Sequence, residues 1–123
     1  MATVLLIEDE AALRLVVRIN LTFDGHDLLE AENGAAGLEL ARTAKPDVIV
    51  LDLRLPDLDG WQVTDELRDD PGTSSIPLIF LTAHTDTATR ERGLQLGAKA
   101  FITKPFDMNE LVECIAEVVP RQP

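Results

Sequence analysis

Short apolar segments that each end in a polar residue constrain the fold of this chain more than any other feature. Val48 to Leu51 form an unbroken apolar run followed by Asp52, which is typical of a strand buried on both faces of a sheet. Residues 4–7, 78–81 and 100–102 form similar runs, and helical patterns separate them. Because strands that alternate with helices build parallel sheets through right-handed crossovers, the pattern predicts an α/β fold.

Five strands and five helices are expected. The strands cover residues 3–8, 26–31, 48–52, 77–82 and 99–103, and the helices cover residues 10–23, 34–44, 60–69, 86–96 and 108–119. The first, third and fourth strands are the most apolar, so we expect them at the centre of the sheet, with strands two and five at its edges. This predicts a flavodoxin-like, doubly wound, five-stranded parallel sheet of order 2-1-3-4-5, with its switch point between strands one and three.

Several helix ends carry recognisable capping residues. Asn33 is a good N-cap for the second helix, and Asp59 with Gln62 predicts a capping box for the third. Asp107 with Glu110 predicts a second capping box before the last helix. The fourth helix is rich in threonine and has a poor apolar stripe, so we expect it to be the loosest element.

Polar side chains stand at the carboxyl ends of the strands. Glu8 and Asp9 end the first strand, Asp52 the third, Thr82 the fourth, and Lys104 follows the fifth. Open α/β sheets place their ligand sites at this edge. Three carboxylates close together need a compensating cation, and an oxygen-only cluster suits Mg²⁺. An ionised aspartate is also a nucleophile for phosphorus, so we expect Asp52 to accept a phosphoryl group as an acyl phosphate.

The composition limits the class of protein. With 123 residues, 46% of them apolar, the chain predicts one globular domain over residues 1–120, followed at residues 121–123 by a tail or the start of a linker. The formal net charge of −11 argues against a direct nucleic-acid or anionic-membrane partner. The single cysteine excludes an internal disulfide, and we find neither a signal peptide nor an apolar stretch of the ~20 residues that a bilayer span needs. We therefore expect a soluble, cytoplasmic protein.

Four motifs at the strand ends resemble those of the receiver domain of bacterial two-component response regulators: Leu6–Glu10, Leu51–Leu53 with Pro56 and Gly60 downstream, Leu81–Ala83, and Lys104–Phe106. The resemblance covers residues 3–119. It implies that Asp52 accepts a phosphoryl group from a phosphohistidine of a sensor histidine kinase or of a histidine phosphotransfer protein.

The resemblance also implies a metal site. Asp9 and Asp52 would bind Mg²⁺ (or Mn²⁺) directly, and the backbone carbonyl of Arg54 would be the third protein ligand. Glu8 would act mainly through water. It stands where Asp is common in the family, and its longer side chain would alter how water bridges it to the metal.

A third set of implied roles concerns the phosphoryl group and the switch. Thr82 and Lys104 would bind the phosphoryl oxygens, and the peptide bond between Lys104 and Pro105 would be cis. Phe101 matches the switch aromatic that turns inward when Thr82 moves toward the phosphate. The surface built from residues 84–119 would then be the output face, which binds an effector protein or a second receiver.

Two positions are expected to tune the lifetime of the phosphoryl group. Arg54 and His84 lie two residues after Asp52 and Thr82, where the family lines the path of the hydrolysing water. We hypothesise that two bulky, basic side chains there slow self-dephosphorylation.

Other functions fit the residues less well. An aspartate-nucleophile phosphatase needs a second Asp two residues after the nucleophile, where this chain has Arg54. A dinucleotide site needs a glycine-rich turn where this chain has Glu8 to Glu10. An inactive scaffold would not need the full set of acids, Thr82 and Lys104. We therefore expect a phosphate-accepting signalling domain and not a true enzyme. A phosphorelay intermediate and the receiver part of a longer regulator or hybrid kinase stay open as alternatives.

Overall fold

The computed structural model describes residues 2–83 and 86–119, in which five strands alternate with five helices. The strands are β1 (Thr3–Ile7), β2 (Asp27–Ala31), β3 (Val48–Asp52), β4 (Leu78–Thr82) and β5 (Ala98–Thr103). The helices are α1 (Ala11–Phe23), α2 (Gly34–Ala44), α3 (Gly60–Asp69), α4 (Thr87–Gln95) and α5 (Met108–Val118). The predicted alternation is confirmed, and each element begins and ends within one residue of its predicted bound.

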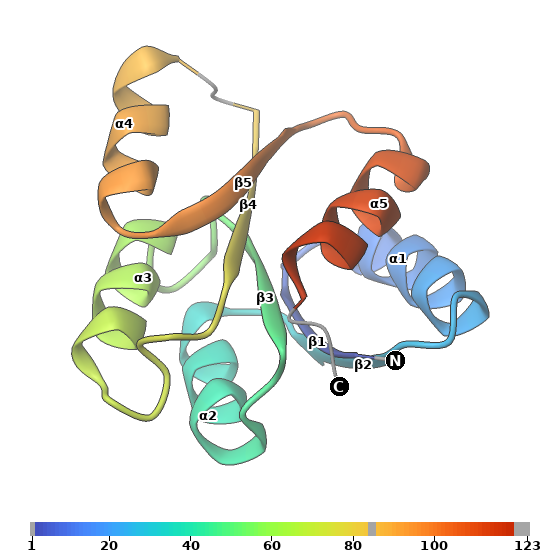
Figure 1. Cartoon of the computed structure of the whole chain (residues 1–123), viewed down its shortest axis with the longest axis horizontal. Coiled ribbons are helices and arrows are strands. Elements are labelled where there is room, and N and C mark those ends of the chain that lie inside the picture. The colour runs from blue at the N-terminus through green and yellow to red at the C-terminus, as the bar shows by residue number, and fades with distance from the viewer. Residues whose placement is uncertain (1, 84–85, 120–123) are drawn as a thin grey trace.

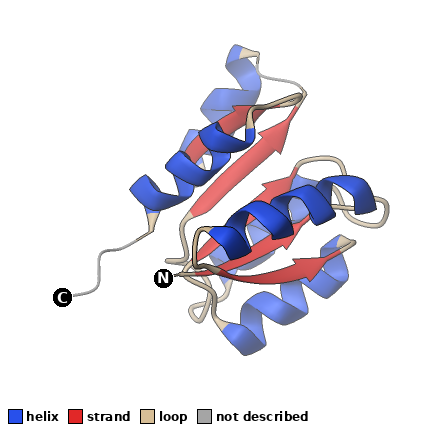
Figure 2. Cartoon of the chain, turned by 90° about the vertical axis from the view of Figure 1, so that its right-hand side faces the viewer, coloured by secondary structure: helices blue, strands red, loops and turns tan. Residues whose placement is uncertain are grey.

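The strands form one parallel sheet in the order β2-β1-β3-β4-β5. Figure 2 shows the strand arrows pointing toward the same end of the molecule. In the register of the sheet, Val50 of β3 lies between Leu6 of β1 and Ile79 of β4. The flavodoxin-like order predicted from the apolar runs is therefore confirmed, and the carboxyl ends of β1 and β3 lie side by side at the switch point.

Two apolar layers cover the sheet. Helices α1 and α5 lie on one face, and α2, α3 and α4 lie on the other (Figure 1). Side chains of β3 alternate between the layers: Val48 and Val50 belong to the cluster with α1 and α5, and Ile49 and Leu51 to the opposite cluster. Each of these four residues is fully buried, which contributes roughly 1.5–3 kcal/mol per side chain. Burial on both faces explains why this strand is apolar throughout.

Two of the three helix caps predicted from the sequence are confirmed. The Asn33 side chain accepts the Ala36 N–H at 2.8 Å, and Asp59 forms the predicted capping box with Gln62. The predicted box at Asp107 is wrong. Its carboxylate accepts the N–H of Asn109, while the Glu110 N–H bonds to the Asp107 carbonyl, because a main-chain turn takes the donor that the box would use.

Helix α4 is the least buried helix. Gly93 is the only buried residue described for it, in agreement with the poor apolar stripe in the sequence. The helix is held by aromatic contacts: the Arg92 guanidinium lies 4.4 Å from the centre of the Trp61 ring, and Gly93 faces the ring of Phe101. The looseness of α4 stays a prediction.

The helices are short. Helix α1 is the longest, with 13 residues. In the described part of the chain, none combines the length and the apolar character that crossing a membrane requires.

Candidate functional site

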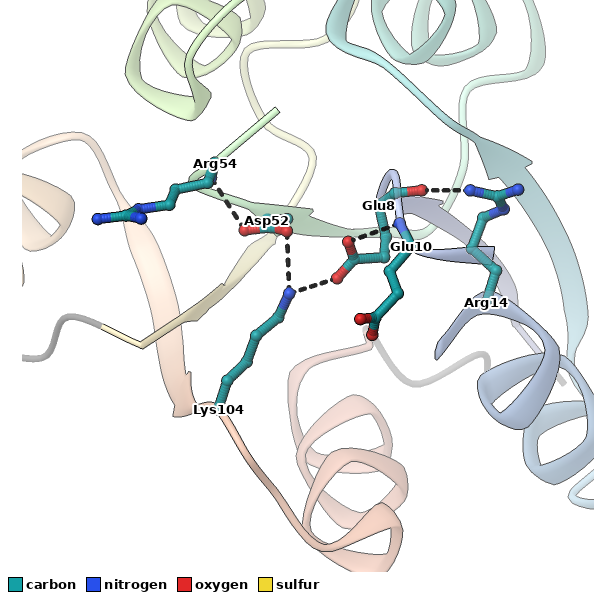
Figure 3. Close-up of polar contacts among 6 residues, drawn as sticks. All are labelled: Glu8, Glu10, Arg14, Asp52, Arg54 and Lys104. Atoms are coloured by element: carbon teal, nitrogen blue, oxygen red, sulfur yellow. Dashed lines mark hydrogen bonds and ion pairs between the residues drawn. The ribbon is translucent and has the colours of Figure 1, made fainter. Parts of the chain in front are cut away.

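The predicted site residues meet at the carboxyl edge of the sheet. Glu8 and Asp9 lie in the loop after β1, Asp52 is the last residue of β3, and Thr82 is the last residue of β4. Lys104 follows β5 and reaches back across the edge (Figure 3). The parallel topology makes this possible, because strands that pair in parallel end at one edge whatever their separation in sequence.

Lys104 joins two of the acids. Its Nζ lies 2.5 Å from Oε1 of Glu8 and 2.9 Å from Oδ2 of Asp52, and Figure 3 shows the ammonium between the two carboxylates. Glu8 and Asp52 are buried, with 0% and 4% of their surface exposed, so water screens these ion pairs poorly. Breaking such a buried pair by removing one partner is costly, because it leaves an uncompensated charge.

Three carboxylates could hold a metal ion. Glu8, Asp9 and Asp52 each offer an oxygen, and these oxygens lie within 4.8 Å of one another. Asp9 is exposed whereas the other two are buried, so the cluster opens to solvent on the side of Asp9. A small group of oxygen ligands with an open side suits Mg²⁺, which keeps several of its waters and takes one or two carboxylates. The residues therefore fit the predicted metal, and each one's role as a ligand stays a prediction.

Burial and charge shift the protonation of this cluster. Burial raises the pKa of Glu8 to about 7, and the neighbouring Asp52 adds to the rise, while the hydrogen bonds from Lys104 and the Glu10 N–H oppose it. Burial alone would lower the pKa of Lys104, but its hydrogen bonds to Glu8 and Asp52 outweigh burial and raise it. Lys104 is therefore a fixed positive charge at neutral pH, whereas Glu8 exchanges its proton near neutrality.

Arg54 contacts the proposed phosphoacceptor through its backbone. The Arg54 N–H donates to Oδ1 of Asp52 at 2.9 Å, and the side chain extends away from Asp52 (Figure 3). Both carboxylate oxygens of Asp52 thus have a partner, since Oδ2 accepts from Lys104. The metal-ligand role predicted for the Arg54 carbonyl stays a prediction. His84, the second predicted tuning residue, lies outside the described residues.

Thr82 and Lys104 are linked through the backbone. The Lys104 N–H donates to the Thr82 carbonyl at 2.9 Å, and the peptide bond from Lys104 to Pro105 is cis, as predicted. Thr82 is buried, with 3% of its surface exposed. With Arg54 and Trp61 it lines a depression of about 260 Å³. A hydroxyl at this place is suited to hydrogen-bond an oxyanion carried by Asp52.

Phe101 lies beneath α4. Its ring is 5.3 Å from the ring of Phe80 in β4, and the Arg90 guanidinium lies 5.7 Å from its centre. The residue is half-buried and packs against the cluster on the α2–α3 side of the sheet. This position connects β4 with α4, which is what a switch residue needs, although the switch role stays a prediction.

Sequence reasoning missed the residues that hold Glu8. The Nη1 atom of Arg14 donates to the Glu8 carbonyl at 2.8 Å, and the Glu10 N–H donates to Glu8 Oε2 at 3.1 Å. Figure 3 shows Arg14 on the side of Glu8 away from Lys104. A backbone carbonyl carries no residue-specific signal, so the sequence offered no pattern from which the Arg14 contact could be found.

The arrangement favours group transfer to Asp52 over hydrolysis by acid–base catalysis. A buried carboxylate, an ammonium and a candidate metal cluster lie together, which is the arrangement that charge neutralisation in phosphoryl transfer requires. Two residues after Asp52, where a phosphatase places its general acid, Arg54 points its side chain away.

Comparison with known proteins agrees with this geometry. The family model for the response regulator receiver domain matches residues 4–116. The chain is 40% identical over 118 residues to the probable transcriptional regulator ycf27 of Porphyridium aerugineum, covering 96% of this chain and 48% of that protein. It is 37% identical over 119 residues to the protein PilH of Pseudomonas aeruginosa, covering 97% of this chain and 98% of PilH. The chain thus spans about half the length of the curated relative ycf27 and nearly all of PilH.

A solved structure has the same fold and a metal. The receiver domain of the sensor histidine kinase PA1611 from Pseudomonas aeruginosa, with a magnesium ion coordinated in its active-site cleft, matches with a TM-score of 0.85 and 31% sequence identity. The match covers 95% of this chain and 96% of that one. The family match over most of the chain, the fold and the clustered acids agree, and the chain belongs to the response regulator receiver domain family.

Proposed function

We propose that Asp52 accepts a phosphoryl group from a phosphohistidine of a sensor histidine kinase or of a histidine phosphotransfer protein. The Asp52 carboxylate attacks phosphorus, an O–P bond forms, the P–N bond breaks, and its electron pair returns to the imidazole. The observation that carries the proposal is the meeting of Lys104 with Asp52 and Glu8 at one sheet edge, next to Asp9. Family membership supports it, since receivers are signalling domains and not an enzyme family.

Neighbouring residues stabilise the charge that develops on the phosphoryl oxygens. The Lys104 ammonium supplies a point charge, and the Thr82 hydroxyl supplies a hydrogen bond. Glu8, Asp9 and Asp52, with the Arg54 carbonyl, would hold Mg²⁺ or Mn²⁺, which supplies the remaining charge neutralisation when bound. After transfer, slow hydrolysis of the acyl phosphate on Asp52 resets the domain.

The phosphorylated state acts by shifting a population of conformations. Thr82 moves toward the phosphoryl group, Phe101 follows, and the face formed by α4, β5 and α5 changes its affinity for an effector protein or a second receiver. We propose that the domain works in the cytoplasm and that, with a net charge of −11, it contacts proteins and not nucleic acid directly. Its place in a longer regulator, a hybrid kinase or a phosphorelay is compatible with the same chemistry.

A small phosphodonor tests the chemistry without the cognate kinase. The chain is incubated with acetyl phosphate and Mg²⁺, and intact mass is followed over time. We expect the mass gain of one phosphoryl group on the wild type, its absence in Asp52→Asn, and its absence when EDTA replaces Mg²⁺. Hydroxylamine, which cleaves acyl phosphates, is expected to remove the gain.

Two results would contradict the proposal. The first is a wild type that stays unmodified although it unfolds cooperatively. The second is an Asp52→Asn variant that is phosphorylated as fast as the wild type. A thermal unfolding curve of each protein separates lost chemistry from lost folding.

A further inference from the structure

Asp57 connects the loop that follows the phosphoacceptor to a helix that takes no part in the site. Its Oδ1 accepts the Gly34 N–H at 2.7 Å, and its Oδ2 accepts the Ala35 N–H at 3.0 Å. Both donors belong to the first turn of α2, more than twenty residues earlier in the chain. These hydrogen bonds hold the pKa of Asp57 below its usual value, so the carboxylate is ionised at neutral pH.

The start of α2 packs tightly against the loop that carries Asp57. A β-carbon on Gly34 would come within 3.0 Å of the Leu58 β-carbon and 2.9 Å of Val63 Cγ2. Only glycine therefore lets the backbone of α2 approach the loop so closely. The loop is also closed at its base, where the Gly60 N–H donates to the Leu53 carbonyl at 3.0 Å.

This loop carries the backbone that contacts Asp52. Arg54 lies in it and donates its N–H to Asp52 Oδ1 at 2.9 Å. The loop is thus held to itself by Gly60, to Asp52 by Arg54, to β4 by Leu53, whose N–H donates to the Leu81 carbonyl at 3.2 Å, and to α2 by Asp57. The Leu53 hydrogen bond holds the first residue of the loop, whereas the two Asp57 hydrogen bonds hold the second half of the loop to an element outside the segment from β3 to α3.

We infer that Asp57 is a positioning residue: its two hydrogen bonds to the start of α2 hold residues 53–59 so that the backbone of Arg54 faces Asp52 and the bound metal. The inference rests on the proposed function, because it concerns the metal site of the phosphoacceptor. Residues that orient metal ligands without touching the metal typically change metal affinity or activity by roughly 10–100-fold when they are removed.

Capping of α2 alone does not account for Asp57. Asn33 already provides the local cap, since its side chain accepts the Ala36 N–H. Asn33 directly precedes α2 and caps it from the neighbouring residue, whereas Asp57 belongs to the loop. The two residues therefore separate helix capping from loop positioning.

Magnesium binding by the full chain tests the inference. Mg²⁺ is titrated into the wild type, Asp57→Ala, Asp57→Asn and Asn33→Ala, and binding is followed by calorimetry and by the fluorescence of Trp61, the only tryptophan of the chain. We expect Asp57→Ala to weaken Mg²⁺ binding about tenfold. Asp57→Asn should recover part of the loss, because its amide oxygen still accepts one N–H. Asn33→Ala should bind Mg²⁺ like the wild type, although it melts earlier.

A charge control completes the experiment. Asp59→Asn removes the same charge from the same loop and keeps a good N-cap for α3, so it measures the electrostatic effect alone. Equal affinity of Asp57→Ala and the wild type overturns the inference, and so does an equal loss in Asn33→Ala or Asp59→Asn. A wild type that binds no Mg²⁺ overturns the proposed metal site as well. If Asp57→Ala does not unfold cooperatively, the Mg²⁺ affinity of Asp57→Asn is compared with that of Asp59→Asn. Equal affinities of these two variants overturn the inference.

Discussion

The ring of Phe101 lies directly against the α-carbon of Gly93. A β-carbon on Gly93 would overlap Cζ of the ring and come within 3.0 Å of Cε1 and Cε2. Helix α4 can therefore rest on β5 in this position only while residue 93 has no side chain. The contact joins the aromatic residue proposed as the switch to the helix proposed as the output face.

Gly93→Ala is expected to destabilise the domain although alanine favours helices. The substitution gains about 1 kcal/mol of helix propensity, and forcing a methyl group into a filled space costs about 1–3 kcal/mol. We expect a net loss of about 1 kcal/mol in the free energy of unfolding, measured by urea denaturation.

The double variant Gly93→Ala with Phe101→Leu isolates the contact. With the ring removed, alanine at position 93 should be neutral or stabilising relative to Phe101→Leu alone. An equal loss in both backgrounds would show that the Phe101 ring is not the cause.

Glu8 makes the stability of the metal-free domain depend on pH. Burial raises the pKa of Glu8 from 4.5, the value of an unperturbed glutamate, to about 7 in the folded protein, so the folded state favours the protonated form. The resulting stabilisation is fully present below pH ~4.5 and is lost as pH rises through about 7. We expect the free energy of unfolding in EDTA to fall by up to about 3 kcal/mol between these values, as urea denaturation at several pH values would measure.

Glu8→Gln provides the matched comparison, because its amide does not titrate. Its stability profile should be flatter than that of the wild type over the same pH range. A profile parallel to the wild type would assign the pH dependence to other groups. Mg²⁺ should restore more stability to the wild type at pH 8 than at pH 5.5, since it binds the ionised carboxylate.

Arg54 is expected to lengthen the life of the acyl phosphate. Arg54 and Thr82 line the same depression. Arg54→Ala should open that depression to water and shorten the phosphoryl half-life severalfold, and His84→Ala should act in the same direction. The half-life is measured by mass spectrometry after the phosphodonor is removed.

Arg54→Lys tests whether bulk or hydrogen-bonding geometry is responsible. A lysine keeps the length and charge, so a half-life close to that of the wild type supports steric and electrostatic shielding. Unchanged half-lives in both Arg54→Ala and His84→Ala would refute the tuning hypothesis.

Much of the fold could be read from local patterns. The run Val48 to Leu51 is buried on both faces, and the caps at Asn33 and Asp59 formed as predicted, because each depends on residues close in sequence. The capping box predicted at Asp107 did not form, because the Glu110 N–H bonds to the Asp107 carbonyl in a main-chain turn. Patterns of this kind predict which elements form, but they carry little information on contacts between distant elements.

The sequence by itself determined the sheet order and the set of residues at its carboxyl edge, because apolar runs that alternate with helices leave few ways to bury both faces. Only the tertiary structure decided which of those residues pair with one another and which of them have shifted pKa values. Lys104 lies between Glu8 and Asp52, and burial there raises the pKa of Glu8. Asp57 binds the start of α2, and Gly93 admits the ring of Phe101. These features arise from contacts between residues that are distant in sequence and from burial of charged groups. A local sequence pattern carries information on neither of these causes.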